Sequence, residues 1–545
     1  CEIENGQARG LLLQTRKFLI ENCRFKGLAM PGILIAPDSV RWGELAPTVD
    51  GTIRDCVFEK CGIVRGACAL AAVVVKGTHD GGADGFAAGV HRNIRILDNR
   101  FSDHNQIKGD NGMTLKTNRT VDMPRRGFLG LAAAGVCAPT AWAAPEDGAK
   151  TLPKWRKGNL QVHLIHTGVA ESTFLIFPDG TTMLLDCGDH AAVTRQDLAV
   201  PVVPGPGRLA GEWIARYVKR VNPNGDRVDY METTHWHSDH CGTPKWQSAA
   251  PGVEWWKHDY VRSGFGLAAE QLHFGKAIDR GWPDYDDPIP LTSRDLVAVR
   301  DHMRKLYAHL GKRDGLTVEK FRLGARDQIV PLKNAVEGFE VFNLCANGKI
   351  AQADGGVRNV YAASFANGAK PAYLNENGMS LGHVITYGKF RYYTAGDFSD
   401  RVETPREKRH MIEDDMAEGV GPVSAAKMNH HGHWSMPTKL VRALRPKIWL
   451  ACVWDQLHTV PETLTRLADR SGGRADALIA PGVFPEPRAT KEAHEPYFKS
   501  LAPECCGKGC HVVLTVPPGG ATFDVAFVAA EDESMRVLGT RHFAS

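Results

Sequence analysis

The stretch Thr234-His235-Trp236-His237-Ser238-Asp239-His240 holds three histidines and one aspartate within six consecutive positions. It ends the run 227–234, which is predicted to be a strand. Because successive side chains of a strand point to opposite faces, the first two histidines and the aspartate can share a face, and the last histidine follows in a turn. Imidazole and carboxylate groups suit zinc and, at some sites, iron or manganese. The stretch therefore predicts a metal site.

The order of these side chains allows two metal ions. We expect His235 and His237 on one ion, and Asp239 and His240 on the other. Zinc is the expected divalent ion, with manganese or iron(II) as alternatives. A histidine-rich surface turn that binds no metal is the competing interpretation.

A sequence H-x-H-x-D-H after a hydrophobic strand resembles the signature of the metallo-β-lactamase superfamily. The resemblance implies an α/β fold, a four-layer αβ/βα sandwich with the metal site at one edge. It also implies an aspartate after an upstream strand, and Asp186 follows Thr182-Met183-Leu184-Leu185. Asp186 is expected to orient a metal ligand rather than to bind metal itself. Asp397, after Tyr392-Tyr393-Thr394-Ala395-Gly396, is expected to bridge the two ions.

The resemblance implies two more histidine ligands. For the second ion the chain offers His430 and His431, of which we favour His431 because it directly precedes Gly432. For the remaining position His383 is the best placed, on an expected strand before Gly388. A histidine without any metal role is an equal alternative for His383.

Within the superfamily, residues from about 160 to 460 look most like the hydrolase domain of DNA-uptake competence proteins. The matching segments are His166-Thr167-Gly168, Ser172 to Ile176, Pro178-Asp179-Gly180, Asn375 to Leu381, Gly396-Asp397, and Lys427 with His430-His431-Gly432. These relatives usually carry serine where this chain has His433. We therefore expect different substrate contacts near the second ion.

The resemblance implies hydrolysis by a metal-activated water. Two divalent ions about 3.5–4 Å apart lower the pKa of a shared water and polarise the substrate oxygen. Asp239 is expected to act as the catalytic residue that aligns this water. Phosphodiesters or related esters are the leading substrates, and a zinc β-lactamase or a lactonase is the alternative. Asp397 as a bridging ligand and the His-His-Gly segment argue against a true β-lactamase, because zinc β-lactamases would need neither.

Composition sets outer limits on the function. The chain has 545 residues, of which 43% are hydrophobic and 23% charged, enough for two or more domains. The net charge of +4 does not support a dedicated nucleic-acid binder, although a local basic groove is compatible with it. No run of 18 apolar residues predicts a membrane span. The expected substrate is a small molecule or a phosphodiester.

Residues 123–143 resemble a twin-arginine export signal. Arg125 and Arg126 precede a short apolar stretch, and Ala141-Trp142-Ala143 has the small-x-small pattern of a cleavage site. The resemblance implies the twin-arginine export machinery as a partner, and a periplasmic or secreted location. A short buried helix is the alternative interpretation.

The N-terminal part has a repeated pattern of its own. The three copies are Ile20-Glu21-Asn22-Cys23-Arg24-Phe25, Ile53-Arg54-Asp55-Cys56-Val57-Phe58 and Ile96-Leu97-Asp98-Asn99-Arg100-Phe101. Such a repeat predicts a partial right-handed parallel β-helix, with a β-sandwich as the competitor. The part resembles the C-terminal coils of family 110 α-1,3-galactosidases. It is expected to be a remnant of that fold, or alternatively a carbohydrate-active module fused to the hydrolase.

Four regions follow from these patterns. They are the β-helix remnant at 1–118, a linker with the export signal at 119–150, the hydrolase at 151–460 and a C-terminal extension at 461–545. The extension alternates apolar and polar residues around Pro517-Pro518-Gly519-Gly520, which predicts hairpin strands in a small accessory sheet. Within the hydrolase, residues 293–310 have helical periodicity.

Overall fold

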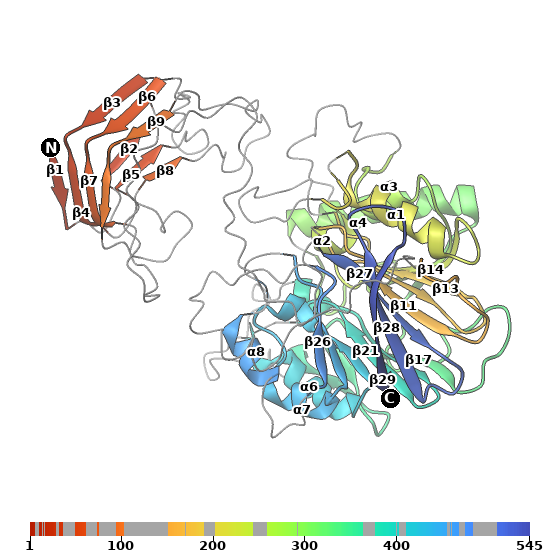
Figure 1. Ribbon diagram of the computed structural model, residues 1–545. Coiled ribbons are helices and arrows are strands. Elements are labelled where there is room, and N and C mark those ends of the chain that lie inside the picture. The colour runs from red at the N-terminus through yellow and green to blue at the C-terminus, as the bar shows by residue number, and fades with distance from the viewer. Residues whose placement is uncertain are drawn as a thin grey trace. The chain divides into compact units, whose positions relative to one another are not determined.

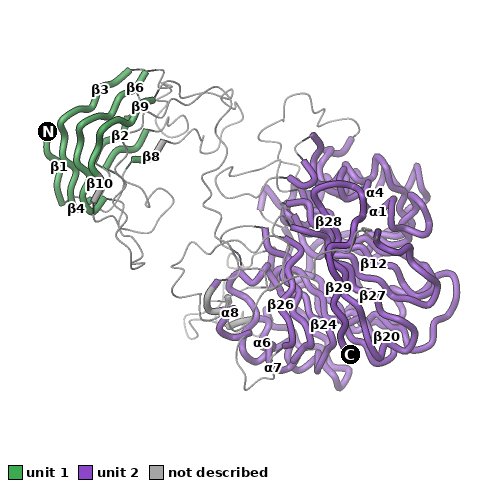
Figure 2. Tube along the Cα trace, in the orientation of Figure 1, with its two compact units in different colours: residues 1–137 green, residues 138–545 purple. Residues whose placement is uncertain are grey.

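The computed structural model of the chain (Figure 1) contains two compact units, Cys1–Cys137 and Ala138–Ser545 (Figure 2). The structure describes residues 1–5, 10–13, 15, 17–28, 32–35, 50–61, 73–75 and 94–102 of the first unit. In the second unit it describes 151–545 except 169, 190–201, 206, 243–258, 292, 363–375, 399–400, 403–409, 455–457, 459, 468–474 and 483–508. The export signal predicted at 123–143, with Arg125 and Arg126, lies outside the described residues.

The described strands of the first unit form three parallel sheets. The first contains β1 (Glu2–Glu4), β4 (Arg24–Leu28), β7 (Val57–Cys61) and β10 (Arg100–Ser102); the second contains β2 (Leu11–Leu13), β5 (Ile33–Ile35) and β8 (Val73–Val75); the third contains β3 (Lys17–Glu21), β6 (Asp50–Arg54) and β9 (Ile94–Leu97). Each sheet thus takes strands in chain order. Winding as a right-handed β-helix stays a prediction.

The sequence repeat sets equivalent residues side by side in this unit. Phe25 pairs in register with Phe58, and their rings stack with centroids 4.9 Å apart. Asn22, Asp55 and Asp98 share a positive φ of 52–54°, a conformation that Asn and Asp tolerate better than most residues. The repeated Asn/Asp positions are therefore the turns between successive strands.

The second unit is built on two large sheets. Within its described residues, the first sheet has the order β16-β15-β14-β13-β12-β11-β27-β28-β29, and the second has the order β19-β18-β17-β20-β21-β24-β25-β26. The bounds in the first sheet are β11 Leu160–Leu164, β12 Thr173–Ile176, β13 Thr182–Leu185, β14 Arg227–Glu232, β15 His273–Asp279, β16 Thr317–Lys320, β27 Cys510–Val516, β28 Thr522–Ala529 and β29 Val537–Ala544. Those in the second are β17 Phe339–Ala346, β18 Lys349–Ala351, β19 Val357–Asn359, β20 Gly382–Tyr387, β21 Phe390–Ala395, β24 Ala425–Lys427, β25 Ile448–Leu450 and β26 Ala477–Ile479. A short pair, β22 (Arg401–Val402) and β23 (His410–Met411), lies outside both.

The two sheets pack on each other and helices cover their outer faces. Side chains from both sheets, such as Leu175 and Leu514 from the first and Ile385 and Tyr392 from the second, form one buried cluster. The helices of the first sheet's outer face are α1 (Ala210–Val221), α3 (Phe265–Ala268) and α4 (Arg294–Asp314); those of the second are α6 (Ile412–Val420), α7 (Thr438–Leu444) and α8 (Pro461–Leu467). The predicted α/β class is confirmed, as is the helix expected at 293–310.

The C-terminal strands correct one expectation. The hairpin around Pro517-Pro518-Gly519-Gly520 is confirmed, because β27 and β28 are antiparallel neighbours. A separate accessory sheet is wrong, since β27 also pairs with β11, with Leu514 opposite Val162. Both side chains are fully buried, so β27 completes the main sheet instead of lying on its surface. None of the helices in the described part of the chain is long and apolar enough to span a membrane.

Burial of His163 in β11 predicts a loss of stability in acid. Its Nδ1 lies 3.0 Å from the Tyr217 hydroxyl, and burial lowers the pKa of His163 to about 3. The unfolded chain binds this proton near pH 6.5, so the free energy of unfolding is unaffected above pH 6.5 and falls as the pH drops from 6.5 toward 3. At pH 5 the loss is about 2 kcal/mol. Urea unfolding gives the free energy of unfolding at pH 7.5 and at pH 5.0. The decrease between these two pH values should be about 2 kcal/mol smaller in His163→Gln than in the wild type. An equal decrease in both proteins would refute the assignment of this effect to His163.

Candidate metal centre

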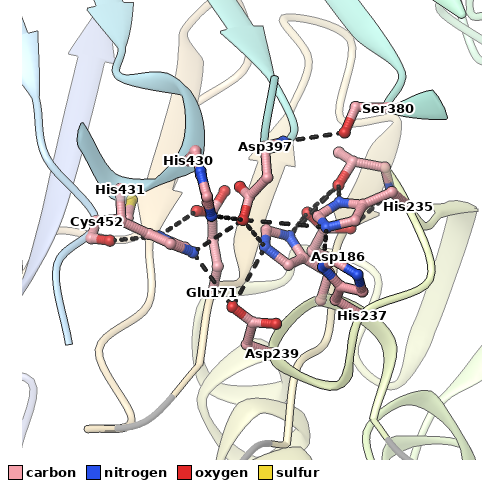
Figure 3. A network of polar contacts seen from close by, with 12 residues as sticks. Glu171, Asp186, His235, His237, Asp239, Ser380, Asp397, His430, His431 and Cys452 are labelled. Carbon is pink, nitrogen blue, oxygen red and sulfur yellow. Dashed lines mark hydrogen bonds and ion pairs between the residues drawn. The ribbon is translucent and has the colours of Figure 1, made fainter. Parts of the chain in front are cut away.

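The candidate site lies where strands of both sheets end (Figure 3). Asp186 directly follows β13, Asp397 follows β21, and His430 and His431 follow β24 in the short helix Asn429–Gly432. Strands β13 and β14 are parallel, as are β21 and β24, so their following loops meet at one edge. The chain therefore gathers these side chains from segments far apart in sequence.

The histidine stretch is less extended than its alternation suggested. Strand β14 ends at Glu232, and α2 (Ser238–Cys241) begins directly after His237. Asp239 and His240 thus lie on a helical turn, where consecutive residues do not alternate between two faces. The same-face argument fails for Asp239, although the helix still brings it to the cluster.

Four buried side chains form the centre of the site. Glu171, His240, Asp397 and His431 each offer a ligand atom, and these atoms lie within 4.8 Å of one another. The Asp397 Oδ2 atom lies 3.1 Å from His240 Nε2 and 3.2 Å from His431 Nε2. One carboxylate oxygen therefore sits between two imidazoles, the position expected of a bridging ligand.

The remaining side chains of the histidine stretch surround this centre. Asp239 Oδ2 lies 3.2 Å from His431 Nε2 and 3.6 Å from His240 Nε2. His235 Nε2 lies 4.0 Å from Asp397 Oδ2 and 3.1 Å from His237 Nδ1. The structure thus brings together the four side chains that the sequence singled out first.

Of the two adjacent histidines, His431 lies deeper in the cluster. His430 Nε2 is 3.9 Å from Asp397 Oδ2, whereas the Nε2 of His431 contacts both Asp397 and Asp239. The other ring nitrogen of His431, Nδ1, lies 2.7 Å from the carbonyl oxygen of Cys452. This contact fixes the ring with Nε2 toward the carboxylates.

Asp186 lies behind the ligand side chains, as expected for an orienting residue. Its Oδ1 accepts the Thr234 N–H at 2.7 Å, and its Oδ2 accepts the Thr234 hydroxyl at 2.8 Å. His240 Nδ1 is also 2.8 Å from Asp186 Oδ2. The carboxylate thereby turns His240 Nε2 toward Asp397.

His383 is the expected ligand that the structure places elsewhere. It lies on β20, the strand that was predicted for it, and it is buried, but its Nε2 lies 2.7 Å from Glu232 Oε1. The Phe321 ring lies beside it, with centroids 5.3 Å apart. The geometry therefore favours the alternative of a histidine without a metal role.

Glu171 is the cluster member that the sequence did not single out. It lies before β12, and its Oε1 is 2.7 Å from the Lys427 ammonium group, while its Oε2 is 3.4 Å from His431 Nδ1. Lys427 and Glu171 are both buried. The only local signal was an acidic residue shortly before the apolar residues Phe174-Leu175-Ile176, and nothing in this segment indicates that Glu171 pairs with Lys427.

The electrostatics follow from packing carboxylates against buried imidazoles. Burial alone would lower the pKa of His431, but Asp397 and Asp239 raise it to about 10. Burial likewise opposes a raised pKa for His240, and Asp397, Asp239 and Asp186 overcome it. The imidazoles in turn hold the pKa of Asp239 and of Asp397 well below its usual range, against the effect of burial. The cluster therefore favours protonated imidazoles on His240 and His431 and ionised carboxylates on Asp239 and Asp397.

The polar atoms of the cluster fit a divalent cation. Asp397 Oδ1 is buried without a hydrogen-bond partner among the described residues. His240 Nε2 and Glu171 Oε2 are buried as well, and their contacts are ion pairs within the cluster, at 3.1 Å to Asp397 and 3.4 Å to His431. Buried polar atoms normally have partners, and imidazole with carboxylate is the donor set that zinc prefers. The residues present therefore suit a metal ion.

The loop that carries His430 and His431 is strained. Four of its non-glycine residues have positive φ: His430 at 47°, His431 at 52°, Trp434 at 55° and Met436 at 58°. Such conformations cost on the order of 1–3 kcal/mol each and persist only where the surroundings enforce them. They commonly occur at functional sites.

A second buried element braces the histidine stretch. Glu376, in the short helix Glu376–Met379, accepts the Trp236 N–H at 3.1 Å and binds Arg280 through two contacts of 2.8 Å. The Arg280 guanidinium lies over the Trp236 ring, 4.6 Å from its centroid. Four residues after Glu376, the Ser380 Oγ accepts the Asp397 N–H at 3.0 Å. One short segment thus contacts both ligand-bearing loops.

Both parts of the chain have matches among known proteins. Residues 166–322 match the family described as Metallo-beta-lactamase superfamily, whose members are mostly metal-dependent hydrolases and commonly bind zinc.

The N-terminal part is similar to proteins named Alpha-1,3-galactosidase A. The one from Peterkaempfera griseoplana is 34% identical over 129 residues, 22% of this chain and 16% of the relative. That of Akkermansia muciniphila is 35% identical over 116 residues (21% and 17%), and that of Bacteroides thetaiotaomicron is 47% identical over 55 residues (10% and 10%). The chain thus spans 10 to 17% of the length of these relatives. The chain therefore carries a metallo-beta-lactamase superfamily domain, matched over residues 166–322, and an N-terminal part similar to α-1,3-galactosidase A proteins.

Proposed function

We propose that this chain is a metal-dependent hydrolase of phosphodiester or related ester bonds, with zinc as its ion. The observation that carries the proposal is the Asp397 carboxylate: its Oδ2 lies between His240 Nε2 and His431 Nε2, at 3.1 and 3.2 Å, and its buried Oδ1 has no hydrogen-bond partner among the described residues. A purely structural network would be expected to satisfy the buried Asp397 Oδ1 atom.

The residues that would hold two ions follow from the geometry. His235 and His237 would bind one ion, Asp239 and His431 would bind the other, and Asp397 would join both. His240 and Glu171 each offer a ligand atom within 4.8 Å of those of Asp397 and His431, so they would complete the set around the second ion. When bound, such ions lower the pKa of water and stabilise negative charge that develops on a substrate oxygen.

The side chains of the chain itself orient the reactants. The Asp239 side chain is 13% exposed and that of His430 is 18% exposed, whereas His240, His431 and Asp397 are at most 2% exposed. A substrate therefore reaches the cluster from the side of Asp239 and His430. The lowered pKa of Asp239 keeps its carboxylate ionised, so it can accept a hydrogen bond from an attacking water.

We also propose that the hydrolase is exported through the twin-arginine sequence at Arg125 and Arg126 and acts in the periplasm or outside the cell. The N-terminal part is proposed to be a β-helix remnant. The parallel sheets and the similarity to α-1,3-galactosidase A proteins support this view. Galactoside binding by that part is the second candidate function.

Hydrolysis by the full chain tests the main proposal. The protein is loaded with zinc or manganese and given an activated phosphodiester, a lactone and a chromogenic cephalosporin. We expect phosphodiester turnover that requires metal and falls at least about 100-fold in His237→Ala. Turnover of only the lactone or the cephalosporin would support the alternative. Bound metal without any turnover would reject these substrate classes, and a protein that binds no metal would reject the proposal.

A further inference from the structure

The strained loop that carries His430 and His431 is fastened at both of its ends to one buried side chain. Glu413 lies in α6 and is fully buried. Its Oε1 atom accepts the Asn429 side-chain amide at 2.8 Å and the Met436 backbone N–H at 2.9 Å. A single carboxylate oxygen therefore joins the first and last residues of the loop Asn429–Met436.

Other contacts close the loop through its backbone, without touching the imidazole rings of His430 and His431. The Ser435 hydroxyl donates to the Asn429 carbonyl at 2.6 Å, and the His433 N–H donates to the His430 carbonyl at 2.6 Å. Arg466 donates to the carbonyls of Ser435 and Met436 at 2.6 and 2.7 Å. These groups hold the chain compact, but the Glu413 contacts are the ones that connect the loop to α6.

We propose that Glu413 is a positioning residue, whose buried carboxylate holds the strained loop in the one conformation that aims His431 at Asp397 and Asp239. The proposal rests on the metal site of the proposed function. Without the two contacts, residues 430, 431, 434 and 436 can relax from positive φ, since left-handed conformations persist only where surrounding structure enforces them. The His431 Nε2 contacts of 3.2 Å to both carboxylates would then be lost.

The protonation state of Glu413 does not weaken this role. Burial raises the pKa of Glu413 to about 8, opposed by the loop contacts from Met436 and Asn429 and by Arg466. Both loop contacts are accepted by Oε1, and Oε2 has no hydrogen-bond partner among the described residues. A proton on Oε2 therefore leaves both contacts in place. For the same reason a glutamine, whose amide oxygen can take the place of Oε1, should support the loop.

The test compares Glu413→Gln with Glu413→Leu in the full chain. Zinc affinity is measured by competition with a chromogenic chelator, and hydrogen exchange of the loop amides is measured in metal-free protein. We expect Glu413→Leu to bind zinc about 10- to 100-fold more weakly, the range for residues that orient ligands. Exchange at Met436 and His433 should rise at least tenfold, while α4 stays unchanged. Glu413→Gln should remain within about threefold of the wild type in both measurements.

A control separates positioning from general destabilisation. Leu306→Ala removes a buried side chain from α4, on the outer face of the other sheet, and should lower Tm without changing zinc affinity. If Glu413→Leu does not fold, Asn429→Ala removes one of the two Glu413 contacts, together with the acceptor of the Tyr393 hydroxyl, and should show an intermediate loss.

The outcomes distinguish this proposal from the proposed function. Wild-type affinity and exchange in Glu413→Leu would overturn the proposal, and so would an equal loss in Glu413→Gln, because an amide oxygen satisfies the same two donors. A wild-type protein that binds no zinc would end the proposed function, whereas loop exchange that rises in Glu413→Leu alone would still support the positioning role.

Discussion

Replacing Asp397 with asparagine is expected to reduce kcat/KM of the metal-loaded protein by about 10²- to 10⁴-fold, the equivalent of several kcal/mol of transition-state stabilisation by bound metal. Asp397 Oδ2 is the atom shared by His240 and His431, and the side chain is 2% exposed. The amide keeps the shape of the side chain but removes the charge that attracts a cation. The loss should therefore appear first as weaker zinc binding, with fewer ions retained after dialysis.

A matched exposed aspartate provides the control for Asp397→Asn. Asp524 lies on β28, where its half-exposed side chain is 2.7 Å from His542 Nδ1. Asp524→Asn makes the same chemical change on the surface and should leave zinc content and turnover unchanged. Metal content by atomic emission and phosphodiester turnover are measured for both variants. Wild-type zinc content together with wild-type turnover in Asp397→Asn would remove Asp397 from the metal site.

The parts of the site that the sequence predicted are those with local signals. The histidine stretch is contiguous, Asp186 directly follows β13, and Asp397 comes two residues after the end of β21, both strands with a clear apolar pattern. Local periodicity identifies such strands, and an acidic residue at a strand end then stands out. These positions could be proposed without knowing how the strands pair.

The parts that the sequence missed depend on long-range packing. Glu171 meets Lys427 across 256 positions of sequence, and nothing in the segment around Glu171 indicates this partner. His383 lies on the strand that was predicted for it, yet pairing places its ring against Glu232. Strand β27 pairs with β11 although the two are more than 300 residues apart. Apolar alternation predicts that a strand exists, but not which neighbour it takes.

The buried pair of Arg280 and Glu376 is expected to have the largest effect on stability. Both side chains are 2% exposed and are joined by two contacts of 2.8 Å. Removing one partner of such a pair leaves a buried charge and typically costs about 3–5 kcal/mol. We expect this loss in the free energy of unfolding for Arg280→Met and for Glu376→Leu, measured by urea unfolding.

The double variant Arg280→Met/Glu376→Leu separates two effects: the cost of an unpaired buried charge, and the loss of the Glu376 contact that supports the histidine stretch. Replacing both partners with apolar side chains is often neutral for stability, so most of the loss should be recovered. The Trp236 N–H, however, loses its acceptor on Glu376, which leaves a residual cost of about 1–3 kcal/mol. Trp236 lies between His235 and His237, so the double variant should remain folded but bind zinc more weakly than the wild type.

An exposed pair shows what burial contributes to this result. Lys439 and Glu418 lie 2.8 Å apart with half-exposed side chains, and Glu418→Leu should cost no more than about 1 kcal/mol. If Glu376→Leu lowered the free energy of unfolding by as little as Glu418→Leu, the Arg280 guanidinium would be hydrated in the variant. The segment Glu376–Met379 would then not be held by this pair. If the double variant bound zinc like the wild type, the histidine stretch would be fixed by Asp186 alone, through its contacts with Thr234 and His240. Recovered stability with weakened zinc binding is the result that assigns the pair to the metal site as well as to the fold.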